Sequence, residues 1–489
     1  MGPHRAAAGA TDGRRSQQHA GASAQSRALG LSGNLLRVGS VRCGVRVGVI
    51  GTGHVGLVTA GAMASIGHVV VGVDNDEAKI ALLQDGTMPF HEPGMSELLQ
   101  DQEQSGRLRY STDPRDAIAG KDVVFICVST PPREDGSPNL SFVQAAAASV
   151  AEHATASTVV AEKSTVPVRT GQRIREALAL EARANRHGFT HEVVSNPEFL
   201  REGTAVADTL RPDRVVVGAD SAAGHEVMRR LYAPLLAQHD CPYIATDVRT
   251  AELIKHASNA YLATKISFIN AIARICELAG ADVETVADAM GHDARIGRAF
   301  LNAGLGYGGS CFPKDVRAFV HIADELGYDF GLLRETERIN REAHAWPVQQ
   351  LRRMLWNLED KTIAILGLSF KPGTDDIRDA PALHVIEELL AEGAKIRAHD
   401  PAAMEHVSRM YPELTYVDKA EEALRDAHAV VVCTEWEEYR DLDAGRIADL
   451  LAYPVVVDAR NVWSSDELAA HGLTVARTGQ PAQAWRPAR

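Results

Sequence analysis

One short stretch near residue 50 limits the possible fold more than any other. An apolar run, residues 45–50, leads directly into the sequence GTGHVG at residues 51–56, and a helix is predicted after it. In such a turn the first glycine permits the sharp bend, the second lets a pyrophosphate approach the backbone, and the third lets helix pack on strand. The first helical N–H groups then face the phosphates. The sequence predicts a dinucleotide site whose cofactor contacts include Gly51, Gly53, His54, Val55 and Gly56.

The second apolar run, residues 69–73, ends in a carboxylate. Asp74 lies at about the distance from the glycines at which an acidic residue accepts hydrogen bonds from the adenosine ribose hydroxyls. The same carboxylate would repel a 2′-phosphate, so we expect NAD rather than NADP. A strand-helix turn without a ligand is the alternative explanation of the glycines, and Asp74 argues against it.

Apolar runs alternate with helical stretches at both ends of the chain. The predicted strands are residues 45–50, 69–73, 122–128, 158–161 and 193–194 in a first set, and 362–366, 395–398, 429–433 and 455–457 in a second. Between the two sets, residues 251–278 predict one long helix, because their apolar residues recur at helical spacing. We therefore predict an α/β protein with parallel sheets, in which two Rossmann-like, doubly wound αβ domains are joined by a central helical connector.

The same pattern gives the predicted boundaries. The first αβ domain is expected at residues 45–247, the helical connector at 248–345 and the second αβ domain at 346–489. Residues 1–44 stand apart, with six arginines and one acidic residue among many Ala, Gly and Ser. We expect a disordered or non-native extension there, although a composition rich in Arg and Ser is also typical of transit peptides.

Composition excludes several classes of protein. A net charge of -13 argues against a nucleic-acid binder, and the absence of any run of 18 apolar residues argues against a membrane span. The six cysteines form no C-x-x-C pair, so we expect neither a metal site nor a disulfide framework, and a reducing cytoplasm is the simplest compartment. An acidic protein that binds anions must gather its basic residues locally, which gives weight to those inside motifs.

The sequence GGSCFPKD at residues 308–315 contains the most reactive candidate. Pro313 suits the first turn of a helix, so Cys311 is expected near a helix N-terminus, where the dipole and backbone N–H groups favour a thiolate. Asp315 follows four residues later, on the same helical face as the sulfur. An inert cysteine buried in a glycine turn is the alternative.

Two further segments carry charges that can serve the same site. Lys255 and Asn259 are four residues apart on the long predicted helix, so an ammonium and an amide can converge on one atom. Residues 195–203, SNPEFLREG, place Glu198 and Glu202 at the end of a predicted strand, the edge at which α/β enzymes carry out chemistry. Each segment by itself could be a solvated charge pair.

The order of these motifs resembles the UDP-glucose/GDP-mannose dehydrogenase family. The resemblance spans residues 45–461 and also includes CVSTP at 127–131 and KSTVP at 163–167. It implies that NAD oxidises an alcohol at the sugar C6 to a carboxylate in two steps, with Cys311 forming a thiohemiacetal and then a thioester. UDP-glucose is the expected substrate, because residues 311–315 resemble that branch more than the GDP-mannose branch; GDP-mannose and UDP-N-acetylhexosamines are the alternatives.

The resemblance also implies roles for particular residues. Lys255 and Asn259 would stabilise an anionic oxygen, Asp315 would receive the alcohol proton, and Glu198 would activate the hydrolytic water, which Thr165 would orient. Lys79, Thr130 and Glu162 or Lys163 are candidates on the nicotinamide side, and Glu202 and Lys314 are assigned to the cofactor. The implied substrate contacts are Phe199, Leu200, Arg295, Phe300, Asn302, Tyr307, Gly308, Phe370, Lys371 and Arg460.

Arg295 resembles an arginine that family members contribute across a dimer interface, so we expect a homodimer built on the connector. The second αβ domain is expected to bind the nucleotide sugar, and no nucleic-acid or membrane partner is expected. Two other functions compete. A single-step 3-hydroxyacid dehydrogenase would need neither Cys311 nor the second αβ domain, and a sensor without catalysis would be expected to lose the reactive residues first.

Overall fold

The computed structural model describes residues 44–133, 135–184 and 189–481. The extension predicted at residues 1–44 lies outside this part of the chain except for Gly44. No helix in the described residues is long and apolar enough to cross a membrane.

The first sheet contains eight strands in the described residues. They are β1 Arg46–Ile50, β2 Val69–Val73, β3 Leu108–Ser111, β4 Val123–Ile126, β5 Val159–Glu162, β6 Glu192–Ser195, β7 Val215–Ala219 and β8 Tyr243–Thr246. Their order is β3-β2-β1-β4-β5-β6-β7-β8. The order reverses beside β1, between β2 and β4, and ligands of doubly wound sheets bind outside the carboxyl ends of the strands at such a point.

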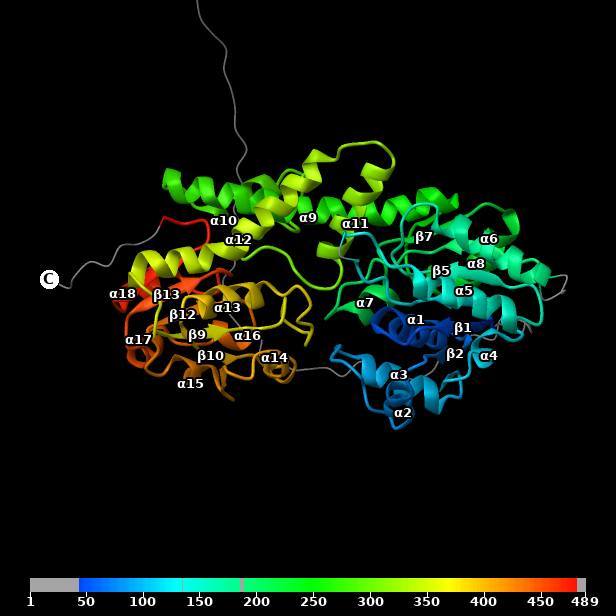
Figure 1. Ribbon diagram of the computed structural model, residues 1–489, viewed down its shortest axis with the longest axis horizontal. Coiled ribbons are helices and arrows are strands. Elements are labelled where there is room, and N and C mark those ends of the chain that lie inside the picture. Colours follow the sequence, from blue (N-terminus) through cyan, green and yellow to red (C-terminus); the bar gives the residue numbers. More distant parts are fainter. Residues whose placement is uncertain (1–43, 134, 185–188, 482–489) are drawn as a thin grey trace, which may run out of the picture. The chain divides into compact units, whose positions relative to one another are not determined.

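Helices cover both faces of this sheet (Figure 1). They are α1 His54–Ser65, α2 Glu77–Gln84, α3 Met95–Gln104, α4 Pro114–Ile118, α5 Ser141–His153, α6 Thr170–Ala184, α7 Ala205–Leu210 and α8 Ala222–Gln238. Alternate residues of the central strands enter two separate cores: Phe125 of β4 packs with α1 and α8, whereas Val124 and Ile126 pack with α5 and α6. The doubly wound arrangement is therefore confirmed.

Two expectations about this sheet were wrong. Strands β3, β7 and β8 were not predicted, although the run Val215–Val217 carries a readable apolar signal. A parallel sheet was expected, but β7, which was not among the predicted strands, runs antiparallel to β6. A parallel crossover needs a connection that crosses the face of the sheet, and the segment between β6 and β7 contains only the six-residue α7.

The central region is helical, as predicted. Its helices are α9 Val248–Ala279, α10 Val283–Gly291, α11 Phe312–Glu325 and α12 Gly331–Leu355. Helix α9 has 32 residues and is therefore about 48 Å long. Its first turn is capped by Asp247, which accepts a hydrogen bond from Thr250 N, and it ends at Gly280 in the left-handed conformation. Helices α11 and α12 pack against it (Figure 1).

The second sheet has six strands in the described residues, all parallel. They are β9 Thr362–Leu366, β10 Lys395–His399, β11 Thr415–Tyr416, β12 Ala429–Val432, β13 Val455–Asp458 and β14 Thr474–Arg477, in the order β11-β10-β9-β12-β13-β14. The helices of this part are α13 Pro381–Ala391, α14 Met404–Met410, α15 Ala420–Leu424, α16 Glu437–Arg440, α17 Ala444–Leu450 and α18 Ser465–Ala470. The short strand β11 and the last strand β14 were not predicted.

Candidate active site

The glycine turn after β1 has the geometry of a phosphate cradle. Gly51 has a φ of +95°, and a Cβ there would lie 2.5 Å from the Cys127 carbonyl oxygen. A Cβ on Gly56 would lie 1.9 Å from the Gly51 oxygen, so α1 packs directly on the turn. At Gly53 a Cβ would meet nothing within 4 Å, and no side chain caps α1. Open space in front of uncapped N–H groups fits a dinucleotide pyrophosphate.

Asp74 is held beside this cradle by three hydrogen bonds to one of its oxygens. Its Oδ2 accepts hydrogen bonds from Thr52 N at 2.8 Å, Thr52 Oγ1 at 2.9 Å and Lys79 Nζ at 2.9 Å. Although burial opposes the shift, these hydrogen bonds lower the pKa of Asp74, so its carboxylate is ionised. Lys79 was expected on the nicotinamide side, and the structure pairs it with Asp74, the residue expected at the adenosine ribose.

His54 opens α1 beside a second carboxylate. Its Nε2 lies 2.8 Å from Glu92 Oε2, and its ring stacks on Phe90 with centroids 4.6 Å apart. Glu92 also accepts hydrogen bonds from the backbone N–H groups of Gly203 and Ala205. The cofactor turn is therefore tied to the loop that carries Glu198 and Glu202.

Cys311 is the residue that precedes α11, as the position of Pro313 predicted. Its Sγ lies 3.4 Å from Ser310 Oγ, and its nearest charged groups include Glu198, Asp315 and Lys255. The expected thiolate is not favoured in the unliganded protein. Burial, together with the negative charges of Glu198 and Asp315, raises the pKa of the thiol to about 11, against the opposing effect of Lys255.

Lys255 and Glu198 form a buried ion pair beside the sulfur. Lys255 Nζ lies 2.7 Å from Glu198 Oε1, and Glu198 Oε2 accepts a hydrogen bond from Leu200 N. Burial would lower the pKa of Lys255, but the charge of Glu198 raises it, so the ammonium stays charged. The two elements that meet here are the loop after β6 and the first half of α9.

Asn259 and Lys314 hold the second carboxylate. Asn259 Nδ2 donates to Asp315 Oδ2 at 2.6 Å, and Lys314 Nζ donates to Asp315 Oδ1 at 2.7 Å. Burial would raise the pKa of Asp315, but Lys314 and Lys255 lower it. Lys255 and Asn259 were expected to converge on one atom; each is bonded to a different carboxylate, and both carboxylates influence Cys311.

Buried hydrogen bonds hold the loop after β6 in place. Lys163 Nζ donates to Asn196 O and Oδ1, and Tyr232 Oη donates to Asn196 Oδ1 at 2.6 Å. Glu162 is also buried, and burial raises the pKa of its carboxyl group to about 8. Lys163 and Glu162 therefore lie beneath the loop, and the structure gives them no contact that indicates a direct role at nicotinamide.

Glu202 and Arg378 complete the site on the side of the second sheet. Glu202 Oε1 accepts from Ser310 Oγ at 2.8 Å, and Arg378 Nη2 lies 3.4 Å away from the same oxygen. Burial first, and then Asp376, raises the pKa of Glu202 to about 7. Sequence reasoning missed Arg378; the signal was a basic residue within the polar segment that follows Phe370-Lys371-Pro372.

Thr130 and Thr165 lie together. Thr130 Oγ1 donates to the Thr165 carbonyl oxygen at 3.0 Å. Both line a small cavity with Lys314 and Asp315. The two threonines were predicted from separate motifs, and the structure places them beside the same carboxylate.

The predicted substrate loop packs tightly against the second αβ part. A Cβ on Gly309 would lie 2.8 Å from the Phe370 ring, and one on Gly308 would lie 2.2 Å from the Asp379 carbonyl oxygen. Lys371 Nζ lies 5.4 Å from the centre of the Phe370 ring. Arg460 Nε donates to the Cys433 carbonyl oxygen at 2.8 Å. Residues that follow strands of the second sheet therefore meet the loop that leads to Cys311.

Other predicted substrate residues lie along the same loop. Phe300 has a φ of +65°, and its ring and that of Tyr307 both contact Phe312. Phe199 lies under the Lys255 ammonium, 5.5 Å from the ring centre. Asn302 is exposed and accepts from Arg298 Nη1 at 2.6 Å.

Arg295 is the predicted substrate residue that this chain leaves outside the site. Its side chain is 88% exposed, and its ion pair is with Asp293, two residues earlier. Its action on a neighbouring subunit therefore stays a prediction.

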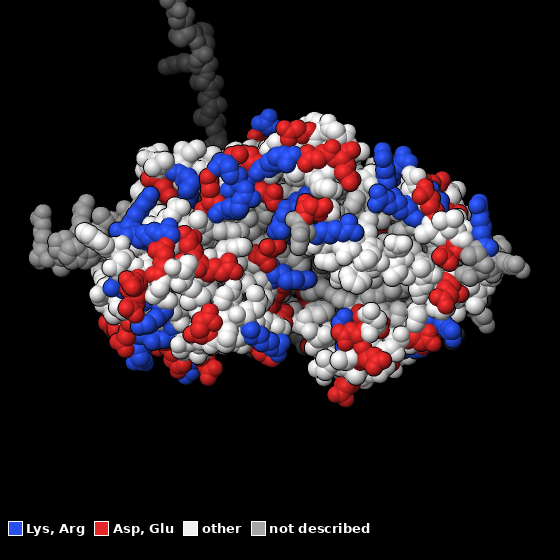
Figure 2. Space-filling model, in the orientation of Figure 1, with Lys and Arg blue, Asp and Glu red and all other residues white. Residues whose placement is uncertain are grey.

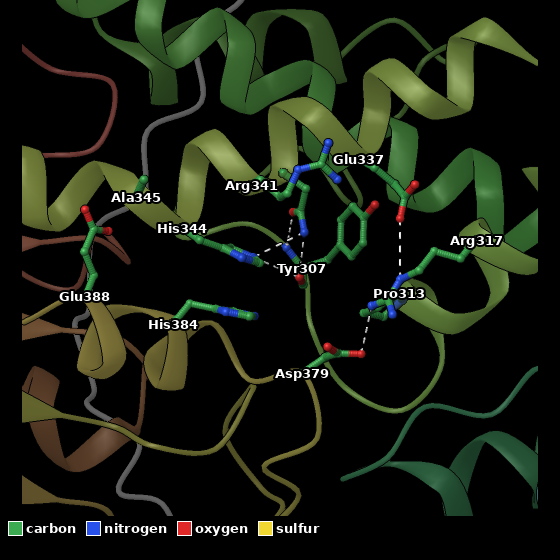
Figure 3. Close-up of a pocket in the computed structure, with 11 residues that line it drawn as sticks. Tyr307, Pro313, Arg317, Glu337, Arg341, His344, Ala345, Asp379, His384 and Glu388 are labelled. Atoms are coloured by element: carbon green, nitrogen blue, oxygen red, sulfur yellow. Dashed lines mark hydrogen bonds and ion pairs between the residues drawn. The ribbon is translucent and has the colours of Figure 1, made fainter. Parts of the chain in front are cut away.

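A larger cavity, of about 520 Å³, lies on the other side of the substrate loop. Figure 3 shows Tyr307 in its lining, with Arg317 and Glu337 on one side and the His344 and His384 rings on the other. The two histidine rings stack with centroids 4.9 Å apart. Over the face seen in Figure 2, acidic and basic side chains are interspersed.

Three models of one family match successive parts of the chain. The NAD binding domain of the UDP-glucose/GDP-mannose dehydrogenase family matches residues 45–236, its central domain matches 249–342 and its UDP binding domain matches 364–465. A UDP-glucose 6-dehydrogenase of Rhizobium meliloti is 44% identical over 441 residues, which cover 89% of this chain and 100% of that relative. The chain belongs to the UDP-glucose/GDP-mannose dehydrogenase family and is an NAD-dependent dehydrogenase.

Solved structures agree with this assignment. A UDP-glucose dehydrogenase from Pyrobaculum islandicum matches with a TM-score of 0.84 at 36% identity, covering 92% of this chain and 100% of that one. A UDP-D-ManNAc dehydrogenase from Pyrococcus horikoshii matches with a TM-score of 0.79 at 26% identity, covering 89% and 99%. The resemblance drawn from the motifs and the predicted fold class are confirmed.

Proposed function

We propose that this chain oxidises the C6 alcohol of UDP-glucose to the carboxylate of UDP-glucuronate, with two NAD consumed and Cys311 as the nucleophile. The observation that carries the proposal is the pair of buried carboxylates around one thiol: Glu198 bonded to Lys255, and Asp315 bonded to Asn259 and Lys314. Bound NAD would accept a hydride in each oxidation.

The first oxidation requires loss of the alcohol proton. Asp315 is ionised and buried, so its carboxylate, or a water that it holds, can take this proton. Lys255 and Asn259 then donate to the substrate oxygen as negative charge develops on it. For this the Lys255 ammonium must share its hydrogen bonds between Glu198 and the substrate.

The covalent step uses the thiol as it is found. The sulfur attacks the aldehyde carbon and forms a C–S bond as the C=O π bond breaks. The thiol proton passes to a neighbouring carboxylate, and the oxygen becomes a thiohemiacetal alkoxide to which Lys255 and Asn259 can donate. The second oxidation converts this adduct to a thioester. Glu198 then removes a proton from water as the water attacks, the C–S bond breaks, and Cys311 regains its proton.

The substrate is proposed from the relatives and from the charges at the loop. Relatives named UDP-glucose 6-dehydrogenase reach 44% identity, whereas the UDP-D-ManNAc dehydrogenase is 26% identical. Lys371 and Arg460 supply positive charge from the second αβ part for a diphosphate. GDP-mannose and UDP-N-acetylhexosamines remain the alternative substrates.

We further propose a homodimer built on α9. Tyr261, Phe268 and Ile275 are spaced seven residues apart and are 63%, 46% and 58% exposed, so they form an apolar stripe along one face of the helix. Such a stripe is typical of a helix that packs against another. Dimerisation would also bring Arg295 of one subunit toward the site of the other. The cytoplasm is proposed as the compartment, and the five cysteines of the described residues, all free, are consistent with it.

The function is tested by counting NADH formed for each sugar nucleotide consumed, with UDP-glucose, GDP-mannose and UDP-N-acetylglucosamine supplied in turn. We expect two NADH for each UDP-glucose and little or none with the others. One NADH for each sugar would contradict the covalent mechanism. No NADH with UDP-glucose would contradict the substrate.

A further inference from the structure

His256 follows Lys255 on α9 and is buried on the same side of the helix as the catalytic residues. Its Nε2 lies 2.7 Å from the Val166 carbonyl oxygen, and its ring lies 5.6 Å from that of Phe319. A carbonyl oxygen only accepts hydrogen bonds, so Nε2 carries the proton. In the neutral imidazole, Nδ1 is therefore an acceptor.

Nδ1 of His256 is buried and has no hydrogen-bond partner within residues 44–133, 135–184 and 189–481. His68, another buried histidine, shows the contrast. Its Nε2 is also bonded to a backbone carbonyl, that of Leu231 at 2.8 Å, but its Nδ1 accepts from Val45 N at 3.2 Å. A buried acceptor without a donor is costly, so the His256 nitrogen indicates a small polar ligand.

A cavity of the right size lies at this ring. Its volume is about 10 Å³, the room of one water molecule, and its lining includes His256, Thr130, Thr165, Lys314 and Asp315. A water here would have several polar partners, as buried waters require. It would lie between the carboxyl group of Asp315 and the imidazole of His256.

The reaction creates a need for such a connection. Oxidation of an alcohol and one water to a carboxylate by two NAD⁺ gives two NADH and three protons. These protons start in a buried site whose bases are Asp315 and Glu198. Asp315 must lose the first proton before it can act again.

We propose that His256 accepts the proton collected by Asp315, through one water in this cavity, and so restores the Asp315 carboxylate within each turnover. The O–H bond of the Asp315 carboxyl group breaks as the water takes that proton. The same water passes another proton to Nδ1, and the imidazole becomes an imidazolium. His256 does not touch the reacting atoms; it is a positioning residue that stores a proton until product release opens the site.

The charged groups around the His256 ring are consistent with an imidazole that holds a proton only briefly. Burial lowers the pKa of His256, and Lys314 and Lys255 lower it further, whereas the Asp315 carboxylate opposes them. Lys314 and Asp315 face the ring from α11, and Lys255 lies on its own helix. The neutral imidazole is therefore the resting form, which leaves the ring able to take up a proton.

The test compares His256→Gln with His68→Gln. A glutamine at position 256 can still donate to the Val166 carbonyl and accept from the water, but it cannot take up a proton. Steady-state rates are measured from pH 6 to pH 10, in H₂O and D₂O, with the sugar nucleotide that yields two NADH. His256→Tyr serves as a second variant, and thermal melts of all variants report folding.

We expect kcat of His256→Gln to fall about tenfold at pH 7, less than the roughly 100-fold cost of losing a general base, with both KM values nearly unchanged. Its kcat should rise with pH toward that of the unaltered protein, because hydroxide replaces the missing acceptor, and its solvent isotope effect should increase. His68→Gln should change none of these.

Three results would overturn the proposal. One is a His256→Gln or His256→Tyr protein that keeps the unaltered pH profile and isotope effect. The second is a loss that appears only in KM for NAD, which would mean that the cavity belongs to the cofactor. The third is a rate loss that does not recover at high pH. The proposal rests on the proposed function, which fails separately if the unaltered protein forms no NADH with UDP-glucose.

Discussion

At Cys311 the surrounding charges oppose the charge that the sulfur needs as a nucleophile. Burial and the carboxylates of Glu198, Asp315 and Glu202 raise the pKa of the thiol, and the positive charge of Lys255 opposes them. This arrangement keeps the unliganded protein in the thiol form, which resists alkylation and oxidation. When Glu198 and Asp315 take up protons during the reaction, they lose the negative charge that raises the pKa of Cys311. The thiolate is then easier to form.

Alkylation of the unliganded protein tests whether Cys311 is in the thiol form. Because the thiolate is the reactive form and the pKa of Cys311 lies at about 11, the rate of iodoacetamide labelling at Cys311 should rise about tenfold for each pH unit between pH 7 and 10. Peptide mass spectrometry would follow the site.

The control is Asp315→Asn, which removes one charge that raises the pKa of the thiol and should label faster than the unaltered protein at pH 8. A labelling rate that levels off below pH 8 would show that the sulfur is already ionised near neutrality.

At the scale of single elements, two glycines of the turn before α1 have different roles, one in folding and one in binding. Gly56 touches the Gly51 carbonyl, whereas Gly53 faces open space and has an ordinary φ of -76°. The two glycines therefore serve different ends, although they belong to one motif.

Gly53→Ala should keep the melting temperature of the unaltered protein but lose the stabilisation that added NAD confers, because the new methyl group occupies space in front of the α1 N–H groups. Gly56→Ala should lower the melting temperature itself, since its Cβ would lie 1.9 Å from a backbone oxygen. Thermal melts with and without NAD measure both. Equal effects of the two substitutions on melting without NAD would contradict the distinction.

Helix α9 carries both Lys255, the proposed catalytic lysine, and the apolar stripe. Phe268→Glu places a charge in the middle of the stripe and should convert the proposed dimer to a monomer, as light scattering after gel filtration would show. Leu180→Glu is the matched control, because Leu180 of α6 is 65% exposed outside the stripe. A dimer that survives Phe268→Glu and dissociates with Leu180→Glu would place the interface elsewhere.

At the scale of the whole molecule, the sequence predicts the elements that have a local pattern. It does not predict the features that depend on contacts between distant segments. The glycine turn, the long helix α9 and the strands that were predicted follow from local pattern, and all were found, whereas the buried strand β7 was missed. Strand β8 has mixed, largely exposed residues, and the antiparallel pairing of β7 depends on a connection rather than on composition.

The site shows the same division. Motifs named Cys311, Lys255, Asn259, Glu198 and Asp315, and the structure brings them together. Their pairing could not be read from spacing, because Lys255 meets Glu198 across 57 residues. Arg378 and His256 were missed, because the contacts that indicate a role for them are made with residues of other elements.

The central claim is that Cys311 holds the sugar carbon between two oxidations, and Glu198→Gln tests it most directly. This variant is mixed with NAD and UDP-glucose, quenched within one turnover, and examined by NADH absorbance and by mass spectrometry of the Cys311 peptide. The account predicts two NADH for each site, followed by a halt with an acyl adduct on Cys311, and no adduct in Cys311→Ser. Two NADH without an adduct, or undiminished turnover, would contradict it.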